Sequence, residues 1–137
     1  QLLDEKREAA ALPTLVAGSW VYGNLATWIG SHDKNHAWDL LCTAKRCFDL
    51  VVASGRLDGP ELQQATRQLA DCEASDWFWW FGDYNPADSV SAFDKLYRRK
   101  LAHLYALLKL PAPGELDLPV SRGKTDSEAT NAMRRAS

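Results

Sequence analysis

A run of aromatic residues between two carboxylates is the part of this sequence best suited to binding chemistry. Residues 75–83 read Ser-Asp-Trp-Phe-Trp-Trp-Phe-Gly-Asp and hold three of the chain's six tryptophans. Rings beside a few placed polar groups form a platform that orients a ligand. A pyranose suits such a platform, because it has an apolar face and a rim of hydroxyls. The alternative is that these rings only fill the core, which is the commoner use of closely spaced aromatics.

Other combinations of reactive side chains are weaker. Asp76 and Asp83 resemble the two carboxyl groups that retaining glycosidases place about 5–5.5 Å apart, but each also suits a turn. His32 and His36 have the spacing of two metal ligands on one helix face, yet no third ligand is near in sequence. There is no phosphate-binding loop and no nucleophile elbow. We therefore expect no metal and no cofactor, and we assign no catalytic residue.

A glycine-aromatic segment precedes the helices that would position these residues. Residues 12–30 contain glycines at 18, 23 and 30, with Trp20, Tyr22 and Trp28 between them. Glycines at this spacing weaken a helix and favour a loop that can bring the backbone close to a ligand. The sequence therefore predicts a loop here that presents rings.

Three apolar patterns with helical period follow this loop. The first starts with Asp33 or Asn35 as its cap and ends near Gly55, and the second opens at 59–60 with a proline in its first turn. Ser75 is placed to cap a short aromatic turn, and the last helix runs from 86–88 to 110–111. Together they predict an all-α fold, a bundle of three or four helices.

The ends of the chain differ from its centre. Residues 2–11 are charged and helix-prone, and residues 122–137 are small and polar without an apolar period, which is typical of a mobile tail. We expect one helical domain over residues 1–121. The chain does not begin with Met, so we expect it to be part of a longer protein.

Composition excludes several classes of protein. A net charge of -2 without a basic face argues against nucleic acid as a partner. No apolar run reaches the roughly 18 residues of a membrane span, and we expect no signal peptide. The three cysteines lie within apolar helical patterns and are typical of reduced thiols in a cytoplasmic protein.

Several motifs, in order, resemble glycoside hydrolase family 57. They are Ala-Gly-Ser-Trp at 17–20, Trp-Ile-Gly at 28–30, Asp-Lys-Asn-His-Ala-Trp-Asp-Leu-Leu at 33–41 and Ala-Ser-Asp-Trp-Phe-Trp-Trp at 74–80. The resemblance covers roughly residues 12–120. It is to the helical region that follows the catalytic barrel in the family's α-amylases, glucanotransferases and branching enzymes. Two positions depart from the family pattern: Ala17 stands where an acidic residue is frequent, and His36 where Arg is common.

The resemblance implies a retaining enzyme acting on α-glucan or maltooligosaccharide, with its catalytic Glu and Asp in a barrel absent from this chain. It also implies that Trp20 and Asp76 reach towards the substrate. Trp28 is a candidate second platform, and Trp77 a further binding residue. The tryptophans of the aromatic run cannot all face one ligand, so we expect Trp79 or Trp80 in the core.

Two other functions fit the same residues. One is a free-standing binding or interaction module that uses the aromatic patch. The other is a structural bundle without a ligand. An exposed tryptophan patch would favour the glycoside hydrolase domain or the binding module over the structural bundle.

Overall fold

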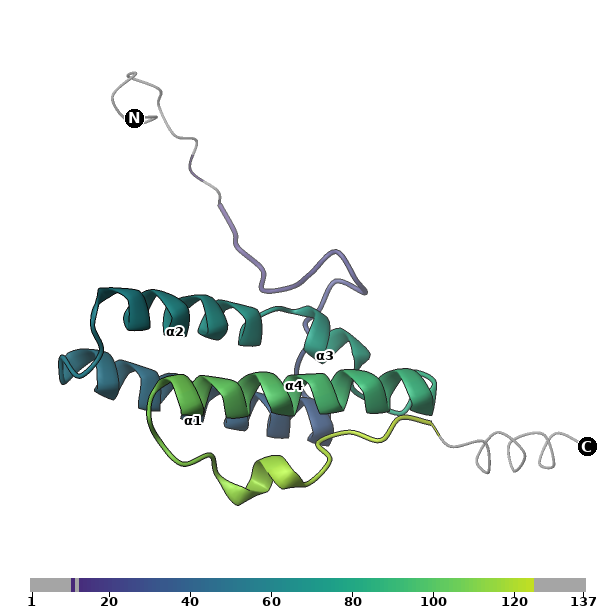
Figure 1. The fold of residues 1–137 in the computed structure, drawn as a ribbon. Helices are drawn as coiled ribbons and strands as arrows, with labels where there is room; N and C mark the ends of the chain where they lie inside the picture. The colour runs from purple at the N-terminus through teal and green to yellow at the C-terminus, as the bar shows by residue number, and fades with distance from the viewer. Residues whose placement is uncertain (1–10, 12, 125–137) are drawn as a thin grey trace, which may run out of the picture.

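The computed structural model describes residue 11 and residues 13–124. Its elements are the α-helices α1 (His32–Ala53), α2 (Gly59–Cys72), α3 (Asp76–Trp80) and α4 (Ala87–Leu107), followed by the 3-10 helix η1 (Gly114–Asp117). The three long helices run beside one another, and the short α3 lies at one end of them (Figure 1). The described residues contain no β-strand beyond a single bridge between Pro86 and Lys124. The predicted all-α bundle is therefore confirmed, whereas the helix expected over residues 2–11 lies almost entirely outside the described residues.

The start of α2 follows the sequence closely. The Asp58 carboxylate accepts the Glu61 backbone N–H at 2.8 Å, and the Glu61 carboxylate accepts the Asp58 N–H at 3.1 Å. This reciprocal pair satisfies two backbone donors that a helix start leaves free. Pro60 lies in the first turn, where its missing N–H costs nothing. The predicted opening at 59–60 is confirmed.

Two other helix boundaries differ from the prediction. Helix α1 begins at His32 with Ser31 in the capping position, so neither Asp33 nor Asn35 is its cap. Asn35 instead accepts the Gly30 N–H at 2.8 Å, which folds the preceding loop back onto the helix. At the other end of the bundle, α4 stops at Leu107, earlier than expected.

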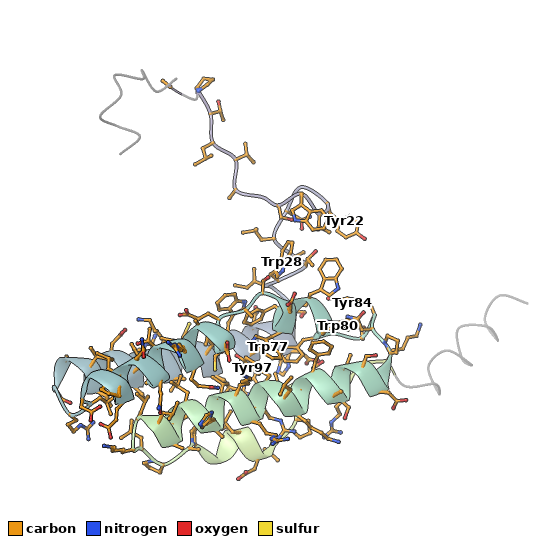
Figure 2. All side chains as sticks on the ribbon, turned by 45° about the horizontal axis from the view of Figure 1, so that its top comes forward. Tyr22, Trp28, Trp77, Trp80, Tyr84 and Tyr97 are labelled. Atoms are coloured by element: carbon orange, nitrogen blue, oxygen red, sulfur yellow. The ribbon has the colours of Figure 1, made fainter. Side chains whose placement is uncertain are left out.

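Helix α4 lies at the centre of the packing, since it contacts α1, α2, α3 and η1. Its Tyr97 is fully buried and donates its hydroxyl to the Ala37 carbonyl on α1 at 2.7 Å. The rings of Trp77, Phe78 and Phe81 surround Tyr97 at centroid distances of 5.4 to 6.3 Å. Figure 2 shows Trp77 and Tyr97 together inside the bundle. The aromatic run therefore supplies much of the core between α1 and α4.

The segment after α4, residues 111–124, is called the strap below. Asp94 on α4 is buried and accepts the backbone N–H groups of Val120 and Ser121 at 2.7 and 3.3 Å. Arg98, one turn later, donates to the same carboxylate at 2.8 Å. One buried ion pair on α4 thus fastens the strap to the bundle.

The strap extends past the boundary expected for a mobile tail. Lys124 donates its backbone N–H to the Asn85 carbonyl at 3.1 Å. Gly123 lies so close to α4 that an added Cβ would meet Ala87 and Val90 atoms at 2.9 and 2.8 Å. Residues 122–124 therefore belong to the folded unit, because their backbone is paired and packed. The rest of the expected tail, 125–137, lies outside the described residues.

Candidate functional site

Residues 18–30, called the aromatic loop below, form a tight turn beside the bundle. A Cβ on Gly18 would lie 2.6 Å from the Gly23 carbonyl oxygen, so position 18 needs glycine, and Gly23 has a left-handed φ of 65° that favours glycine. Tyr22 has a φ of 54°, in the left-handed region. Such a backbone costs a bulky residue of the order of 1–3 kcal/mol and is most often held at functional sites. The loop therefore holds the backbone of Tyr22, whose ring is large and exposed, in an unfavourable conformation.

Lys34 on α1 holds the aromatic loop from below. Its ammonium donates to the Thr27 carbonyl, to the Ala26 carbonyl at 3.4 Å and to the Tyr84 hydroxyl at 2.8 Å. The side chain is only 2% exposed. Burial lowers the pKa of Lys34 from the usual lysine value, because the charged form loses water. Three oxygen acceptors compensate for that loss.

Tyr84, on the loop between α3 and α4, forms the opposite wall. The centre of its ring lies 4.9 Å from the Lys34 ammonium, and its hydroxyl donates to the Trp79 carbonyl at 2.8 Å. Burial and the neighbouring Asp83 carboxylate both raise the pKa of Tyr84. The phenol therefore stays neutral at physiological pH.

Asn85 completes this wall by capping the end of α3. Its side-chain amide donates to the Trp79 carbonyl at 3.1 Å and to the Trp80 carbonyl at 3.0 Å. Carbonyls at a helix end need such partners, since they have none within the helix. The strap supports the same loop, because the Ser121 hydroxyl accepts the Gly82 N–H at 3.1 Å. Both contacts fix the position of Tyr84 between them.

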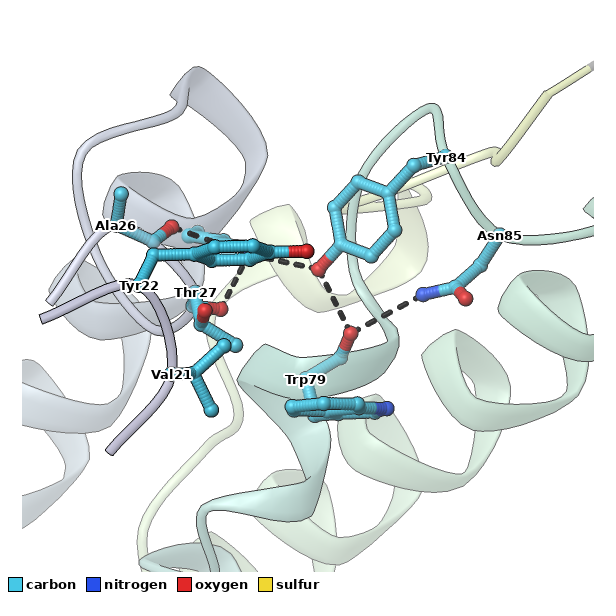
Figure 3. A pocket seen from close by; sticks show the side chains of 8 residues that line it. Val21, Tyr22, Ala26, Thr27, Trp79, Tyr84 and Asn85 are labelled. Carbon is cyan, nitrogen blue, oxygen red and sulfur yellow. Dashed lines mark hydrogen bonds between the residues drawn. The ribbon is translucent and has the colours of Figure 1, made fainter. Parts of the chain in front are cut away.

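An open cleft of about 450 Å³ lies between the aromatic loop and this wall (Figure 3). Tyr22 points from the loop towards the Tyr84 side, and the Trp79 ring lies below. Among the residues that the structure describes, no carboxylate lines the cleft, and the polar groups of the lining are an ammonium, hydroxyls, an amide and carbonyls. The lining residues are Val21, Tyr22, Ala26, Thr27, Lys34, Trp79, Tyr84 and Asn85. Rings with a few fixed polar groups are the usual composition of a small-molecule site.

The two residues that the family resemblance places near a substrate are both exposed. Trp20 is 87% exposed on the aromatic loop, one residue before the cleft lining begins. Asp76 is exposed as the first residue of α3. Neither lines the cleft, so the structure does not join them into one pocket.

Trp77 was predicted to face a ligand, and this prediction is wrong. Its side chain is 7% exposed, and its indole N–H donates to the Asp71 carbonyl at 2.9 Å. The short α3 turns this ring towards α4, where it packs against Phe93 and Tyr97. No face of the ring remains for a sugar.

The expectation that Trp79 or Trp80 is the core tryptophan also needs correction. Trp79 is 39% exposed and lines the cleft. Trp80 is half-buried and stacks on Phe93 at a centroid distance of 4.6 Å. The fully packed ring is Trp77, because a single helical turn determines which of these side chains faces α4.

Trp28 lies at the base of the aromatic loop. Its ring is 6.3 Å from that of Trp79, and its carbonyl accepts the Trp38 indole N–H at 2.9 Å. Trp38 in turn stacks on Phe78 at 4.1 Å. Trp28 therefore links the loop to the core, and its role as a sugar platform stays a prediction.

Sequence reasoning missed Lys34, Tyr84 and Asn85 as cleft residues, and it placed Tyr22 only among the rings of the predicted loop. Lys34 did carry a signal, since it lies at helical spacing from the buried Ala37 on the apolar face of α1. A lysine on such a face must find buried acceptors. Two of those acceptors lie within eight positions of Lys34 in sequence, and the third, on Tyr84, lies 50 positions away. No local sequence pattern identifies them.

Other polar groupings do not form a second site. Across the described residues, no three His, Cys, Asp or Glu side chains are grouped as a metal site would require. His32 contacts Asp33 at 3.4 Å on the surface. Within the same residues, no helix combines the length and apolar character needed to cross a bilayer.

Comparisons with models of protein families, with curated proteins and with solved structures each found no match to this chain.

Proposed function

We propose that this chain is the helical domain of a glycoside hydrolase of the family 57 type, acting on α-glucan. In this proposal it completes a glucan-binding cleft beside a catalytic barrel that is not within this sequence. The ordered set of motifs over residues 12–120 supports the family, and the open aromatic surface supports the ligand.

The exposure of large rings around the aromatic loop is the observation that carries the proposal. Trp20 and Tyr22 are 87% and 88% exposed, and Tyr84 and Trp79 are 56% and 39% exposed. Grouped apolar surface of this kind usually marks an interaction site. Sugar rings stack on exposed aromatic faces, while their hydroxyls bond to polar groups at the rim. In a purely structural bundle, such rings would be expected to pack in the core and not to face solvent.

The segment that leads into the aromatic loop supports a neighbouring domain. Leu15 and Val16 are 88% and 79% exposed, and Leu25 and Ile29 are each 46% exposed. This apolar surface is continuous in sequence with the exposed rings. In the proposal the barrel covers part of it. A free-standing binding module is the second candidate, and it uses the same rings without a barrel.

The cytoplasmic location is part of the same proposal. Cys42, Cys47 and Cys72 are free thiols, and Cys72 is buried in the core. Free thiols of this kind persist in a reducing compartment.

Electrophoresis of the chain through gels that contain glycogen tests the proposal. We expect glycogen to retard the chain, and Trp20→Ala to weaken binding by about 1–3 kcal/mol, as for a lost aromatic anchor. Leu50→Ala is the control, because Leu50 is 71% exposed on α1 and outside the cleft lining. A chain that glycogen does not retard, or a Trp20→Ala variant retarded as fully as the parent, would contradict the proposal.

A further inference from the structure

The lysine in the cleft has no N–H group left for a ligand. A lysine ammonium carries three donors. In Lys34 these point to the carbonyls of Ala26 and Thr27 and to the Tyr84 hydroxyl. Two of the acceptors belong to the aromatic loop and the third to the opposite wall. The ammonium therefore joins the two walls of the cleft.

An anion would gain little from this lysine. Phosphate and carboxylate ligands are normally recognised by charge-assisted N–H donors that point at their oxygens. To supply one, Lys34 would have to release an acceptor while it remains 2% exposed. Releasing either loop carbonyl or the Tyr84 hydroxyl would give up one of the three bonds that offset the burial of the ammonium, so the exchange would bring little net gain.

The groups that remain available in the cleft are neutral. Both amide hydrogens of Asn85 are used on the carbonyls of Trp79 and Trp80, which leaves its side-chain oxygen as an acceptor. The exposed Tyr22 hydroxyl and the Trp79 indole N–H have no hydrogen-bond partner among the described residues. These acceptors and donors match hydroxyl groups, and the rings between them match the apolar face of a sugar.

We infer that the cleft is a subsite for a neutral glucosyl segment, and that Lys34 spaces its walls and does not bind an anion. This inference rests on the proposed function, since α-glucan is the source of that segment. It adds Tyr22, Trp79, Tyr84 and Asn85 to the binding residues. The sequence placed Tyr22 in the predicted loop and Trp79 in the aromatic run, but it assigned none of the four to ligand binding. The volume of about 450 Å³ falls within the roughly 300–1,000 Å³ of small-molecule sites.

The indole N–H signals of the six tryptophans give a direct test by NMR. We would titrate the full 137-residue chain with maltotriose and, separately, with inorganic phosphate at matched ionic strength. The Trp79 signal should shift with maltotriose and stay in place with phosphate. The Trp77 signal is the internal control, because its N–H is bound to the Asp71 carbonyl in the core.

Tyr22→Asn removes the ring at the cleft and keeps the turn, since Asn tolerates the left-handed backbone that Tyr22 adopts. We expect this variant to raise the Kd for maltotriose about tenfold. Leu50→Ala, on an exposed part of α1, should leave the Kd unchanged. Both side chains are largely exposed, so neither change threatens the fold.

The results separate the subsite from the proposed function. Suppose that glycogen retards the chain, but maltotriose does not shift the Trp79 signal and the Kd of the Tyr22→Asn variant for maltotriose equals that of the parent. The subsite is then wrong and the proposed function stands. A Trp79 shift with phosphate but not with maltotriose overturns the neutral-ligand assignment. If neither glycogen nor maltotriose binds, the proposed function fails and the subsite fails with it.

Discussion

At the scale of single residues, the tryptophans of this chain differ in what their indole groups contact. The indole N–H of Trp77 donates to a backbone carbonyl within the bundle, and that of Trp38 donates to the Trp28 carbonyl at the base of the aromatic loop. Trp20 is 87% exposed and projects from the aromatic loop. Deleting a packed ring costs a protein about 3–5 kcal/mol, whereas deleting an exposed one costs little stability. Changes at Trp20 therefore report on binding and not on folding.

Asp76→Asn tests whether this exposed carboxylate holds a sugar hydroxyl. The fold should survive, because the amide has nearly the same shape. Glycogen affinity should fall by about 0.5–2 kcal/mol, since a bond to a charged acceptor is worth roughly 1.5–3 kcal/mol against about 1 for a neutral one. Gel retardation and the Tm are measured on the same variant. A lower Tm with unchanged affinity would make Asp76 a structural residue at the start of α3.

At the scale of elements, α4 and the strap together determine where the cleft wall lies. Asp94 and Arg98 hold the strap, and Ser121 of the strap binds the Gly82 N–H on the loop that carries Tyr84. Lys124 pairs with Asn85 on the same loop. The C-terminal end of the described chain thus braces a wall built from its middle.

Two ion pairs with the same i,i+4 spacing but different burial test this brace. We expect Asp94→Ala to lower the free energy of unfolding by about 3–5 kcal/mol, because it leaves Arg98 without its partner and two strap N–H groups without an acceptor. Asp49→Ala breaks the exposed pair with Lys45 and should cost no more than about 1 kcal/mol. Urea denaturation measures both. Equal losses in the two variants would contradict a special role for the strap.

At the scale of the whole molecule, the core keeps three weakly acidic groups neutral. Burial raises the pKa of Cys72 to about 12 and that of Tyr105 to about 12, and it also raises the pKa of Tyr97. In the unfolded chain a thiol and a phenol ionise near about 8.5 and 10. At pH values between the unfolded-state pKa and the folded-state pKa of such a group, the unfolded state binds fewer protons than the folded state.

The stability of the bundle should therefore fall as the pH rises from about 9 towards 12. Lys34 acts in the opposite sense, because its pKa is lowered in the fold. It is one group against the three core groups and Tyr84, whose pKa is also raised. Urea denaturation at several pH values measures the trend. The decline should be shallower in Cys72→Ala, which removes one of the three groups. Stability that stays constant or increases over this range would refute the prediction.

The chain alone should not hydrolyse α-glucan. A retaining glycosidase needs two carboxyl groups flanking the scissile bond, and none of the described residues that line the cleft carries a carboxylate. Purified chain incubated with starch, glycogen and maltooligosaccharides should release no reducing sugar. Turnover that a point mutation in this chain abolishes would show that a catalytic pair had been overlooked.

The sequence by itself determined which segments of this protein form the long helices. Apolar residues at helical spacing defined α1, α2 and α4, and the proline in its first turn marked the start of α2. These signals are local, because a helix bonds within itself and its cap lies within four residues. Glycines at 18 and 23 likewise identified the aromatic loop, since a Cβ on Gly18 would meet the Gly23 carbonyl and Gly23 has a left-handed φ of 65°.

Only the tertiary structure decided which aromatic rings are core and which are surface. Trp77 and Trp79 lie two residues apart in one run, and the contact of α3 with α4 buries the first and exposes the second. The cleft depends on Lys34 reaching Tyr84, 50 positions along the chain. A lone lysine in an apolar stripe shows that buried acceptors must exist. Which acceptors they are is decided by the packing of distant segments, because a hydrogen bond depends on distance in space and not on separation in sequence.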